Sequence, residues 1–478
     1  MKMKVYLLFY IFLFIPYFVL SEINKYNNLN YSASSINENL SNITIMNNNT
    51  LKNVVYITKN DITITDSIIF KKGDTINYGL YSVNSAILVN GGGLTIIRGL
   101  IGTSVKGINA IVSTSNGTVR INGTNIILTG DSYSKGLQGT YGGKIIASNI
   151  VIKTIGISST TLSSEYGIVI CTDCELETWG LGSPLIHSVG TIKVTNTRGL
   201  ANKAQAIVIE GNKSETVINS SYLKCNANPN KNKHDQCGIL MHESISGNID
   251  HGTSSFTCQN STVEILSSSN YSSLAPMFLI INTNANINLN KCNFTYGSNI
   301  FLKIDKNNFG DSDSKGRTIT LTLKNQNIVG DIIVAQNCSL KINLIKSTII
   351  GTINKDKTAS KLSIISDSDS SITLTGNSYY TSFKNYISNN SNINTGNHTW
   401  RNYEISASNT NNRKGHNKKI NNFSSYSNSI SSGKEEDEIY EDVQTLETVK
   451  SLINPSLLKN MLIFILFIDC VLLKIIIK

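Results

Sequence analysis

The cysteines are the residues whose spacing most directly suggests chemistry. Cys171 and Cys174 enclose two residues, a spacing that suits a metal ion or a redox pair, but no second Cys-x-x-Cys accompanies them, so a zinc site has little support. In an oxidising compartment, disulfides are the better interpretation. The candidate disulfide cysteines are Cys171, Cys174, Cys225 and Cys237, and a Cys225–Cys237 bridge would close the polar loop between them.

Metal-binding patterns built on other residues are weak. His234, His242 and His251 lie near the candidate disulfide cysteines, but their spacing matches no metal motif. Asp311 begins a stretch that resembles a calcium loop, yet its twelfth position is Thr322 rather than Glu, which excludes an EF-hand. We therefore predict no metal site and no cofactor.

A glycine repeat indicates the elements that must position any site. Gly79, Gly107, Gly136 and Gly167 follow one another at 28, 29 and 31 residues, each between two larger residues. Within each unit, further Gly- or Asn-led runs rich in Ile and Val follow, so every period holds three short strands. Later in the chain the period falls to 21 residues. Repeats of this size indicate stacked coils.

The predicted fold is all-β: a single right-handed parallel β-helix (a β-solenoid), with a flexible stalk and a C-terminal membrane tail. One coil cannot bury its inward Ile, Val and Leu, whereas a stack of coils forms a continuous core. Asn side chains stacked in register can hydrogen-bond to one another. A β-sandwich is the competing interpretation, but it predicts closer strand spacing.

The chain ends suggest secretion and attachment. Two lysines and an apolar run open the chain and are typical of a signal peptide. The predicted organisation is a signal peptide at 1–21, a low-complexity segment or cap at 22–52, the parallel β-helix at 53–400, a polar stalk at 401–433, an acidic spacer, helical or disordered, at 434–458, and a transmembrane helix or GPI-attachment signal at 459–478.

Composition limits the classes of partner that the chain is expected to bind. The formal net charge is +10 and acidic residues concentrate at 435–447, so the rest of the chain is basic and could favour acidic glycans. No Lys/Arg cluster interleaved with aromatic residues occurs, so no nucleic-acid partner is predicted. Candidate N-glycosylation sequons begin at Asn116, Asn122, Asn219, Asn260, Asn293 and Asn397.

A family resemblance follows from the repeats. Residues 75–200 and 277–400, the latter including LKNQNIVGDIIVAQNCSLKINLIKSTIIGTINKD, resemble the passenger regions of adhesin-like surface proteins with right-handed parallel β-helices of the pectin-lyase-like type. The resemblance implies a fold rather than a catalytic motif. The apolar C-terminal tail leaves no room for an autotransporter domain.

Enzymes with this architecture provide a test of whether the chain is catalytic. Glycosidic hydrolysis needs two carboxylates across a groove, so acids should recur at the coil period. Asp131, Asp173 and Asp250 are isolated instead. We therefore predict a non-catalytic, adhesin-like cell-surface protein with an extracellular body that binds glycans or other cells. The alternatives are a polysaccharide lyase or hydrolase and a purely structural coat protein.

Overall fold

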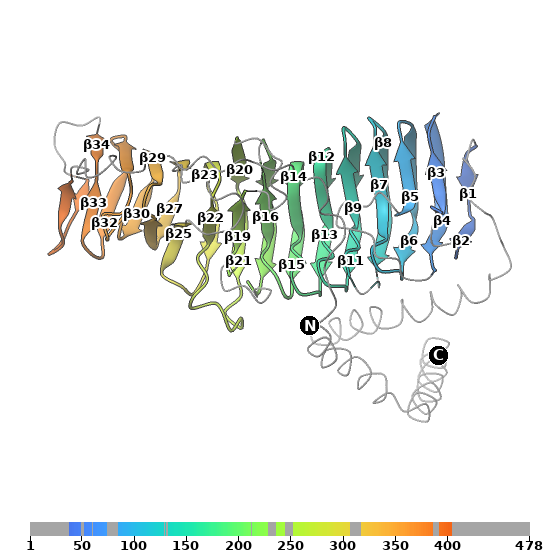
Figure 1. Cartoon of the computed structure of the whole chain (residues 1–478), viewed down its shortest axis with the longest axis horizontal. Coiled ribbons are helices and arrows are strands. Elements are labelled where there is room, and N and C mark those ends of the chain that lie inside the picture. Colours follow the sequence, from blue (N-terminus) through green and yellow to red (C-terminus); the bar gives the residue numbers. More distant parts are fainter. Residues whose placement is uncertain are drawn as a thin grey trace, which may run out of the picture. The chain divides into compact units, whose positions relative to one another are not determined.

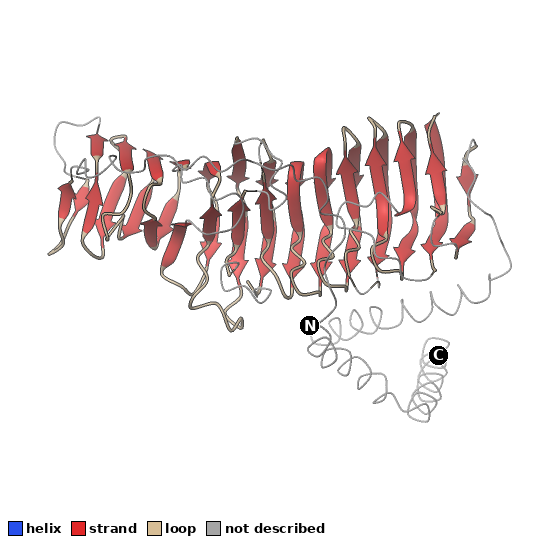
Figure 2. Cartoon of the chain, in the orientation of Figure 1, coloured by secondary structure: helices blue, strands red, loops and turns tan. Residues whose placement is uncertain are grey.

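The structure is a computed structural model that describes residues 38–48, 52–59, 61–73, 85–128, 130, 132–211, 213–227, 236–243, 252–305, 317–385 and 392–403. These residues all belong to the first of two compact units, Met1–Ser406. The predicted signal peptide, acidic spacer and terminal apolar segment lie outside the described residues. Within the described part the regular structure consists only of strands, so no helix there could span a membrane (Figure 2).

Every strand pairing among the described residues is parallel, and the largest sheet has 30 strands. That sheet comprises β1 (Leu40–Ser41), β2 (Thr44–Asn47), β3 (Val55–Ile57), β4 (Asp61–Lys71), β5 (Ser85–Asn90), β6 (Gly93–Thr103), β7 (Asn109–Thr114), β8 (Thr118–Leu128), β9 (Leu137–Thr140), β10 (Lys144–Ser148), β11 (Val151–Thr154), β12 (Leu162–Thr172), β13 (Glu175–Thr178), β14 (Ile186–Thr195), β15 (Arg198–Ala201), β16 (Ile207–Glu210), β17 (Glu215–Asn219), β18 (Tyr222–Cys225), β19 (Ile239–His242), β20 (Thr253–Gln259), β21 (Thr262–Ile265), β22 (Phe278–Ile281), β23 (Asn284–Asn290), β24 (Asn293–Thr295), β25 (Ile300–Asp305), β26 (Thr318–Lys324), β28 (Asp331–Val334), β29 (Ser339–Ile345), β31 (Lys361–Ser366) and β34 (Ser382–Asn385).

Two smaller sheets complete the set. The first holds four strands, β27 (Asn327–Val329), β30 (Thr348–Gly351), β32 (Ser371–Leu374) and β35 (Ile393–Asn394). The second pairs β33 (Ser378–Tyr380) with β36 (Trp400–Asn402). The strands follow one another in chain order from the blue β1 to the orange β34 (Figure 1). An all-β chain with a long parallel sheet is compatible with a β-solenoid.

The register shows how the chain advances through the sheet. Ile62, Leu94, Val119, Ile145 and Val169 are partners in consecutive strands. We call the chain between two consecutive partners of such a ladder a coil. Because partner residues of neighbouring strands lie side by side, the inward residues of successive coils stack directly on one another.

Coil length varies more than the sequence predicts. The predicted period was 21 to 31 residues, whereas the coil from Ile364 to Phe383 takes 19 and the coil from Thr216 to Phe256 takes 40. The difference arises in the connections between strands, because parallel pairing fixes only the paired residues. Connections can therefore change length while the ladder stays intact.

The core follows from strand alternation. In β29, Leu340, Ile342 and Leu344 are buried and the residues between them are more exposed. Inward residues of this kind from β2 to β32 form one continuous apolar cluster. Each fully buried Ile or Leu contributes about 1.5–3 kcal/mol relative to an exposed position, so the stack is stabilised chiefly by this column of aliphatic side chains.

One set of strands is buried on both faces. Every residue of β9, β16, β19 and β22 is buried. Alternate residues of these strands join the core, and the intervening residues point to the opposite face. On that opposite face a second, separate apolar cluster forms from Val208, Cys237, Leu240, Leu279 and Ile281. We call this opposite side the outer face.

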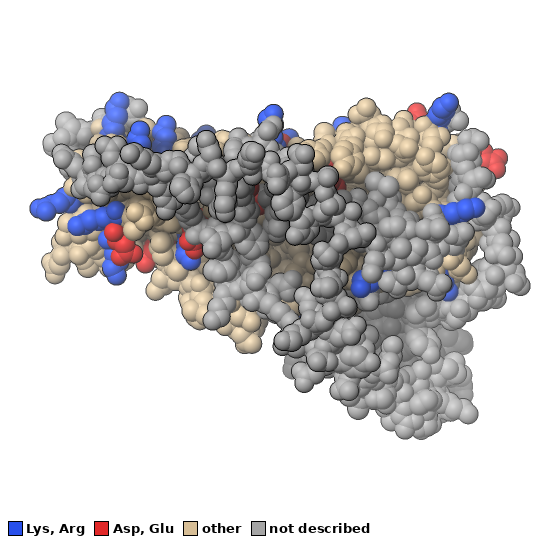
Figure 3. Space-filling view, viewed as in Figure 1, with Lys and Arg blue, Asp and Glu red and all other residues tan. Residues whose placement is uncertain are grey.

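Charged side chains are distributed sparsely. In the view of Figure 3, Lys and Arg are scattered over the described part and no continuous basic patch is visible. Several of them are paired, as in the contacts Lys153–Glu177 at 2.9 Å and Lys193–Glu215 at 3.3 Å, which join neighbouring coils. Exposed pairs of this kind contribute about 1 kcal/mol or less each.

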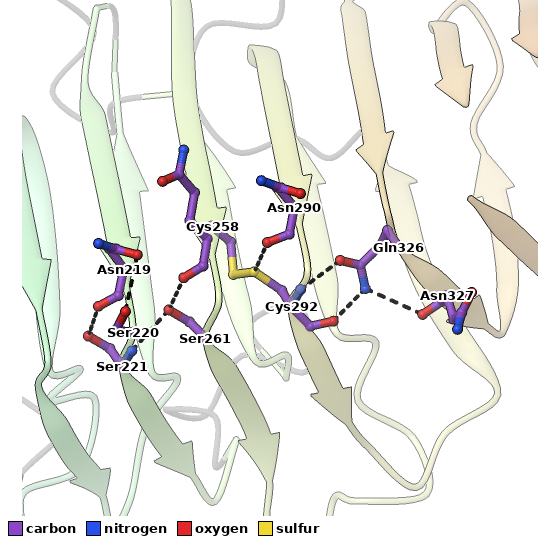
Figure 4. The surroundings of a disulfide bond; sticks show 10 residues. Asn219, Ser220, Ser221, Cys258, Ser261, Asn290, Cys292, Gln326 and Asn327 are labelled. Atoms are coloured by element: carbon purple, nitrogen blue, oxygen red, sulfur yellow. Dashed lines mark hydrogen bonds between the residues drawn. A yellow bond between two sulfur atoms is a disulfide. The ribbon is translucent and has the colours of Figure 1, made fainter. Parts of the chain in front are cut away.

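Buried hydroxyl groups connect the coils at one turn, in a series we call the hydroxyl ladder. The amide of Thr197 donates to Ser221 Oγ at 3.1 Å, and the amide of Ser221 donates to Ser261 Oγ at 3.0 Å (Figure 4). Further along, the amide of Gln326 donates to Ser347 Oγ at 3.1 Å. The sequence predicts stacks of Asn side chains, whereas at this turn the acceptors are Ser hydroxyls, whose short side chains fit inside the turn.

Candidate functional site

The outer face brings residues of five coils into one row, three of them polar and two apolar. Gln138, Ser163, His187, Val208 and Leu240 are consecutive partners in β9, β12, β14, β16 and β19. Their sequence neighbours, such as Leu137 and Ile207, belong to the core. Because side chains alternate along a strand, the row itself points away from the core.

A contact between a histidine and a glutamate lies at the centre of this face. His187 Nε2 lies 3.0 Å from Glu210 Oε2, and His242 is the strand partner of Glu210 in the next coil. Lys135, just before β9, and Glu165 in β12 interact electrostatically with this pair. We call Lys135, Glu165, His187, Glu210 and His242 the polar cluster. All of its members are buried except His187, which is half-buried.

Burial shifts the ionisation of two members. Removal from water lowers the pKa of Lys135 to about 8, against the opposing charges of Glu165 and Glu210. Burial likewise raises the pKa of the Glu165 carboxyl, although Lys135 and His187 oppose this shift. The cluster therefore combines both signs of charge in a poorly solvated place, a property common at binding and catalytic sites.

Two buried polar atoms on this face have no hydrogen-bond partner: Gln138 Nε2 and Glu165 Oε2. The residues are 0% and 7% exposed. The Thr140 hydroxyl lies near the Glu165 carboxyl, but neither it nor Glu165 Oε2 makes a hydrogen bond of ordinary geometry. Buried polar atoms in proteins are nearly always paired. This face consequently offers a donor and an acceptor on neighbouring coils to an additional polar group.

A cavity of about 190 Å³ adjoins the polar cluster. Its polar lining comprises Lys135, His187, Gln205, Glu210 and His242, with Ser158 and Thr160 from a turn. Its apolar lining comprises Pro184, Val208 and Leu240. One side of the cavity therefore presents donors and acceptors and another presents hydrocarbon.

An exposed aromatic pair is formed by one residue directly after β9 and one residue within β12. Tyr141 follows β9 and Tyr166 follows Glu165, and the two are 57% and 52% exposed. Their ring centroids are 6.2 Å apart with planes inclined by 28°, so they stack on neighbouring coils. Burial raises the pKa of Tyr166, and the charges of Glu165 and Glu210 add to this shift. We call Tyr141 and Tyr166 the tyrosine pair.

Two glutamates that the sequence analysis did not consider lie on one face. Glu165 and Glu210 lie on the same face two coils apart, since Val189 is the partner of Glu165 and belongs to the intervening coil. The sequence carries a signal that was missed, because each glutamate comes shortly before a coil glycine, Gly167 or Gly211. Of the acids considered earlier, Asp173 lies in a turn, and residues 131 and 250 lie outside the described part.

The structure contains one of the predicted cysteine pairings and contradicts the other. Cys171 and Cys174 form a disulfide. The bridge between Cys225 and Cys237 is not formed, because Cys225 points into the core and remains a thiol, whereas Cys237 belongs to the outer apolar cluster. The sheet wall separates them. Burial raises the pKa of the Cys225 thiol to about 12.

A second disulfide joins Cys258 to Cys292 in adjacent coils (Figure 4). The coil alignment could have revealed it, because the strands containing or preceding these cysteines are neighbours, with Cys258 opposite Leu289. The separation of 34 residues spans about one coil.

The sequon asparagines are placed compatibly with modification. Asn116, Asn122, Asn260, Asn293 and Asn397 are exposed, and Asn219 is half-buried. Glycosylation itself stays a prediction. Among the described residues, no group of three or more His, Cys, Asp or Glu side chains is arranged to hold a metal ion. His242 lines the cavity, and residues 234 and 251 are outside the described ranges.

Comparison with known proteins adds no relative. No protein-family model, no curated protein and no solved structure matches the chain. The case for function therefore depends on the outer face.

Proposed function

We propose that this chain is a secreted, surface-attached, right-handed parallel β-helix whose outer face binds glycans without chemical change. The parallel register of its coils supports the fold, and the apolar segments at the two ends of the sequence support secretion and attachment. An extracellular body held by the predicted membrane tail would present this face to other cells.

The observation that carries the proposal is the tyrosine pair beside the polar cluster. Exposed tyrosines offer a flat apolar surface with a polar edge, which suits the C–H face of a sugar ring. Glu210 and His187 are hydrogen-bonding groups on the same face, and polar groups of this kind orient hydroxyl-bearing ligands. Neither the tyrosine pair nor the polar cluster would by itself suggest a glycan ligand.

A binding experiment tests the proposal. The purified full chain is applied to an immobilised glycan panel and the affinity for each positive glycan is measured by calorimetry. The double variant Tyr141→Ala/Tyr166→Ala should lose about tenfold in affinity or more, since exposed aromatic anchors dominate such contacts. Tyr222→Ala is the matched control, because Tyr222 is exposed but belongs to β18, where its ring contacts Lys224.

The outcomes separate the alternatives. Glycan binding that depends on the tyrosine pair and not on Tyr222 supports the proposal. Absence of binding across neutral and acidic glycans contradicts it and leaves the structural coat protein. Binding that disappears at high salt in every variant would instead favour attraction by the basic chain as a whole.

A second candidate function is hydrolysis or lyase cleavage of polysaccharides, favoured by the two glutamates of the polar cluster. Two strand spacings place their backbones roughly 9–10 Å apart, and a pair of carboxyl groups on one face is what acid–base cleavage of a glycosidic bond requires. New reducing ends or unsaturated products from pectin, alginate or xylan, absent with Glu210→Gln, would establish this function in place of binding alone.

A further inference from the structure

We infer that the cavity admits one terminal, uncharged sugar ring, so that the protein recognises the ends of glycan chains rather than their interior. This inference rests on the proposed glycan binding and specifies which part of the ligand the site reads.

The size of the cavity is the first argument. At about 190 Å³ it is smaller than the roughly 300–1,000 Å³ typical of pockets for drug-sized ligands. A single ring fits such a volume, whereas several linked rings need a longer groove. The turn residues Ser158, Thr160 and Pro184 line the cavity together with Val208 and Leu240 of the sheet.

The chemistry of the lining is the second argument. Val208 and Leu240, which are partners in adjacent coils, form an apolar wall, while Lys135, Gln205 and Glu210 supply hydrogen-bonding groups. A pyranose ring has the same two-sided character, with C–H groups on one face and hydroxyls at its edge. Hydroxyls both donate and accept, so they suit a lining that contains donors and acceptors together.

The charge of the cluster is the third argument. His187 contacts Glu210, and Lys135 interacts electrostatically with Glu165 and Glu210. In this poorly solvated place an entering carboxylate would be opposed by Glu165 and Glu210 and an entering ammonium group by Lys135, which is costly. An uncharged ligand avoids that repulsion.

The orphan atoms are the fourth argument. Gln138 Nε2 and Glu165 Oε2 are buried and lack hydrogen-bond partners, Glu165 in the coil next to His187 and Gln138 one coil further away. Neither residue lines the cavity itself, but the face beside the cavity has hydrogen-bonding capacity that the described residues leave unused, as expected where a polar ligand binds.

The test uses the full chain and a defined set of sugars. Monosaccharides and linear oligomers of two to six units are taken from the gluco, manno, galacto and xylo series, with oligogalacturonates as the charged comparison. We expect the matching monosaccharide to compete with its oligomers, the affinity to change less than threefold from two to six units, and the oligogalacturonates to bind at least tenfold more weakly.

Variants distinguish the cavity from the tyrosine pair. Leu240→Trp should fill the cavity and reduce affinity for every length at least tenfold, whereas Leu240→Met, of similar volume, should retain binding. Thermal unfolding of both variants checks whether the fold persists. If Leu240→Trp unfolds, Glu210→Gln takes its place and should lower monosaccharide affinity about tenfold.

Each result decides one question. Affinity that rises steeply with chain length, with no monosaccharide competition and no effect of the cavity variants, overturns end recognition while the proposed glycan binding stands. Stronger binding of oligogalacturonates overturns the preference for an uncharged ring. Failure of every sugar to bind overturns the proposed function and this inference together.

Discussion

The backbone amide of Ser221 donates a hydrogen bond to the side-chain oxygen of Ser261 at 3.0 Å, although 40 residues separate them in the sequence (Figure 4). Both residues are nearly inaccessible to water. A turn amide that the strand pairing leaves unused is thus satisfied by the next coil. The hydroxyl ladder therefore adds side-chain hydrogen bonds to the backbone hydrogen bonds that join neighbouring coils at this turn.

Removing one hydroxyl from the ladder should weaken the fold locally. Ser261→Ala leaves the Ser221 amide buried without an acceptor, which costs about 1–3 kcal/mol. Ser255→Ala, on the half-exposed side of β20, should change the free energy of unfolding by about 0.5 kcal/mol or less. Urea unfolding followed by circular dichroism measures both. Equal midpoints for the two variants would contradict the assignment.

The two disulfides should differ in their effect on stability. Cys258–Cys292 closes 34 residues and Cys171–Cys174 closes 3. In the chain-entropy view, loss of the longer loop costs about 4 kcal/mol and loss of the shorter about 2 kcal/mol. The paired variants Cys258→Ala/Cys292→Ala and Cys171→Ala/Cys174→Ala test this by thermal unfolding. A larger loss from the second pair would show that packing rather than loop closure dominates.

Phe278 should be a large contributor to the middle of the stack. Its ring contacts Phe256, Phe294 and Phe301 at centroid distances between 5.3 and 5.6 Å, and it is fully buried. Phe278→Ala should lower the free energy of unfolding by about 3–5 kcal/mol. Leu274→Ala, whose side chain is 63% exposed, is the control. A cost near that of the control would mean that the cavity collapses or that the coil unfolds independently.

Lys135 should make stability depend on alkaline pH. Its folded pKa of about 8 lies below the ordinary lysine value of about 10.4, so between these values the unfolded chain binds more protons and stability rises with pH. Relative to Lys135→Met, the wild type should gain about 1–3 kcal/mol between pH 7 and pH 10.

Urea unfolding at both pH values measures this gain. Lys153→Met, which removes a lysine paired with Glu177 on the surface, controls for the change in net charge. Parallel pH profiles for the wild type and Lys135→Met would contradict the effect assigned to burial.

The repeat pattern predicts much of the architecture because it depends on local rules. Gly107 and Gly136 mark successive coils, and the Ile- and Val-rich runs after them are strands of one parallel sheet. Alternation also identifies the core side of each strand, as in β29. The hand of the coils and the nature of the terminal apolar segment stay predictions.

The candidate site was harder to predict because it depends on register across coils of unequal length. The contact between His187 and Glu210 can be predicted only if the chain between them is known to form one short coil. Likewise, whether Cys225 and Cys237 can bond depends on which side of a wall each faces, a property that spacing in the sequence does not encode. Coils of unusual length, such as the 40-residue coil, make both the His187–Glu210 contact and the cysteine pairing hard to predict from the sequence.

One coil toward the C-terminal end of the sheet has the same length on each of its strands, and this has an evolutionary consequence. Leu321 pairs with Ile342, Ile328 with Ile349 and Ile332 with Ile353, the same offset of 21 residues on three successive strands. Excision or duplication of any 21 consecutive residues here would rejoin the polypeptide in phase. A single slippage event during replication could thus add or subtract a whole layer, which lets a lineage adjust the reach of the protein without redesigning a fold.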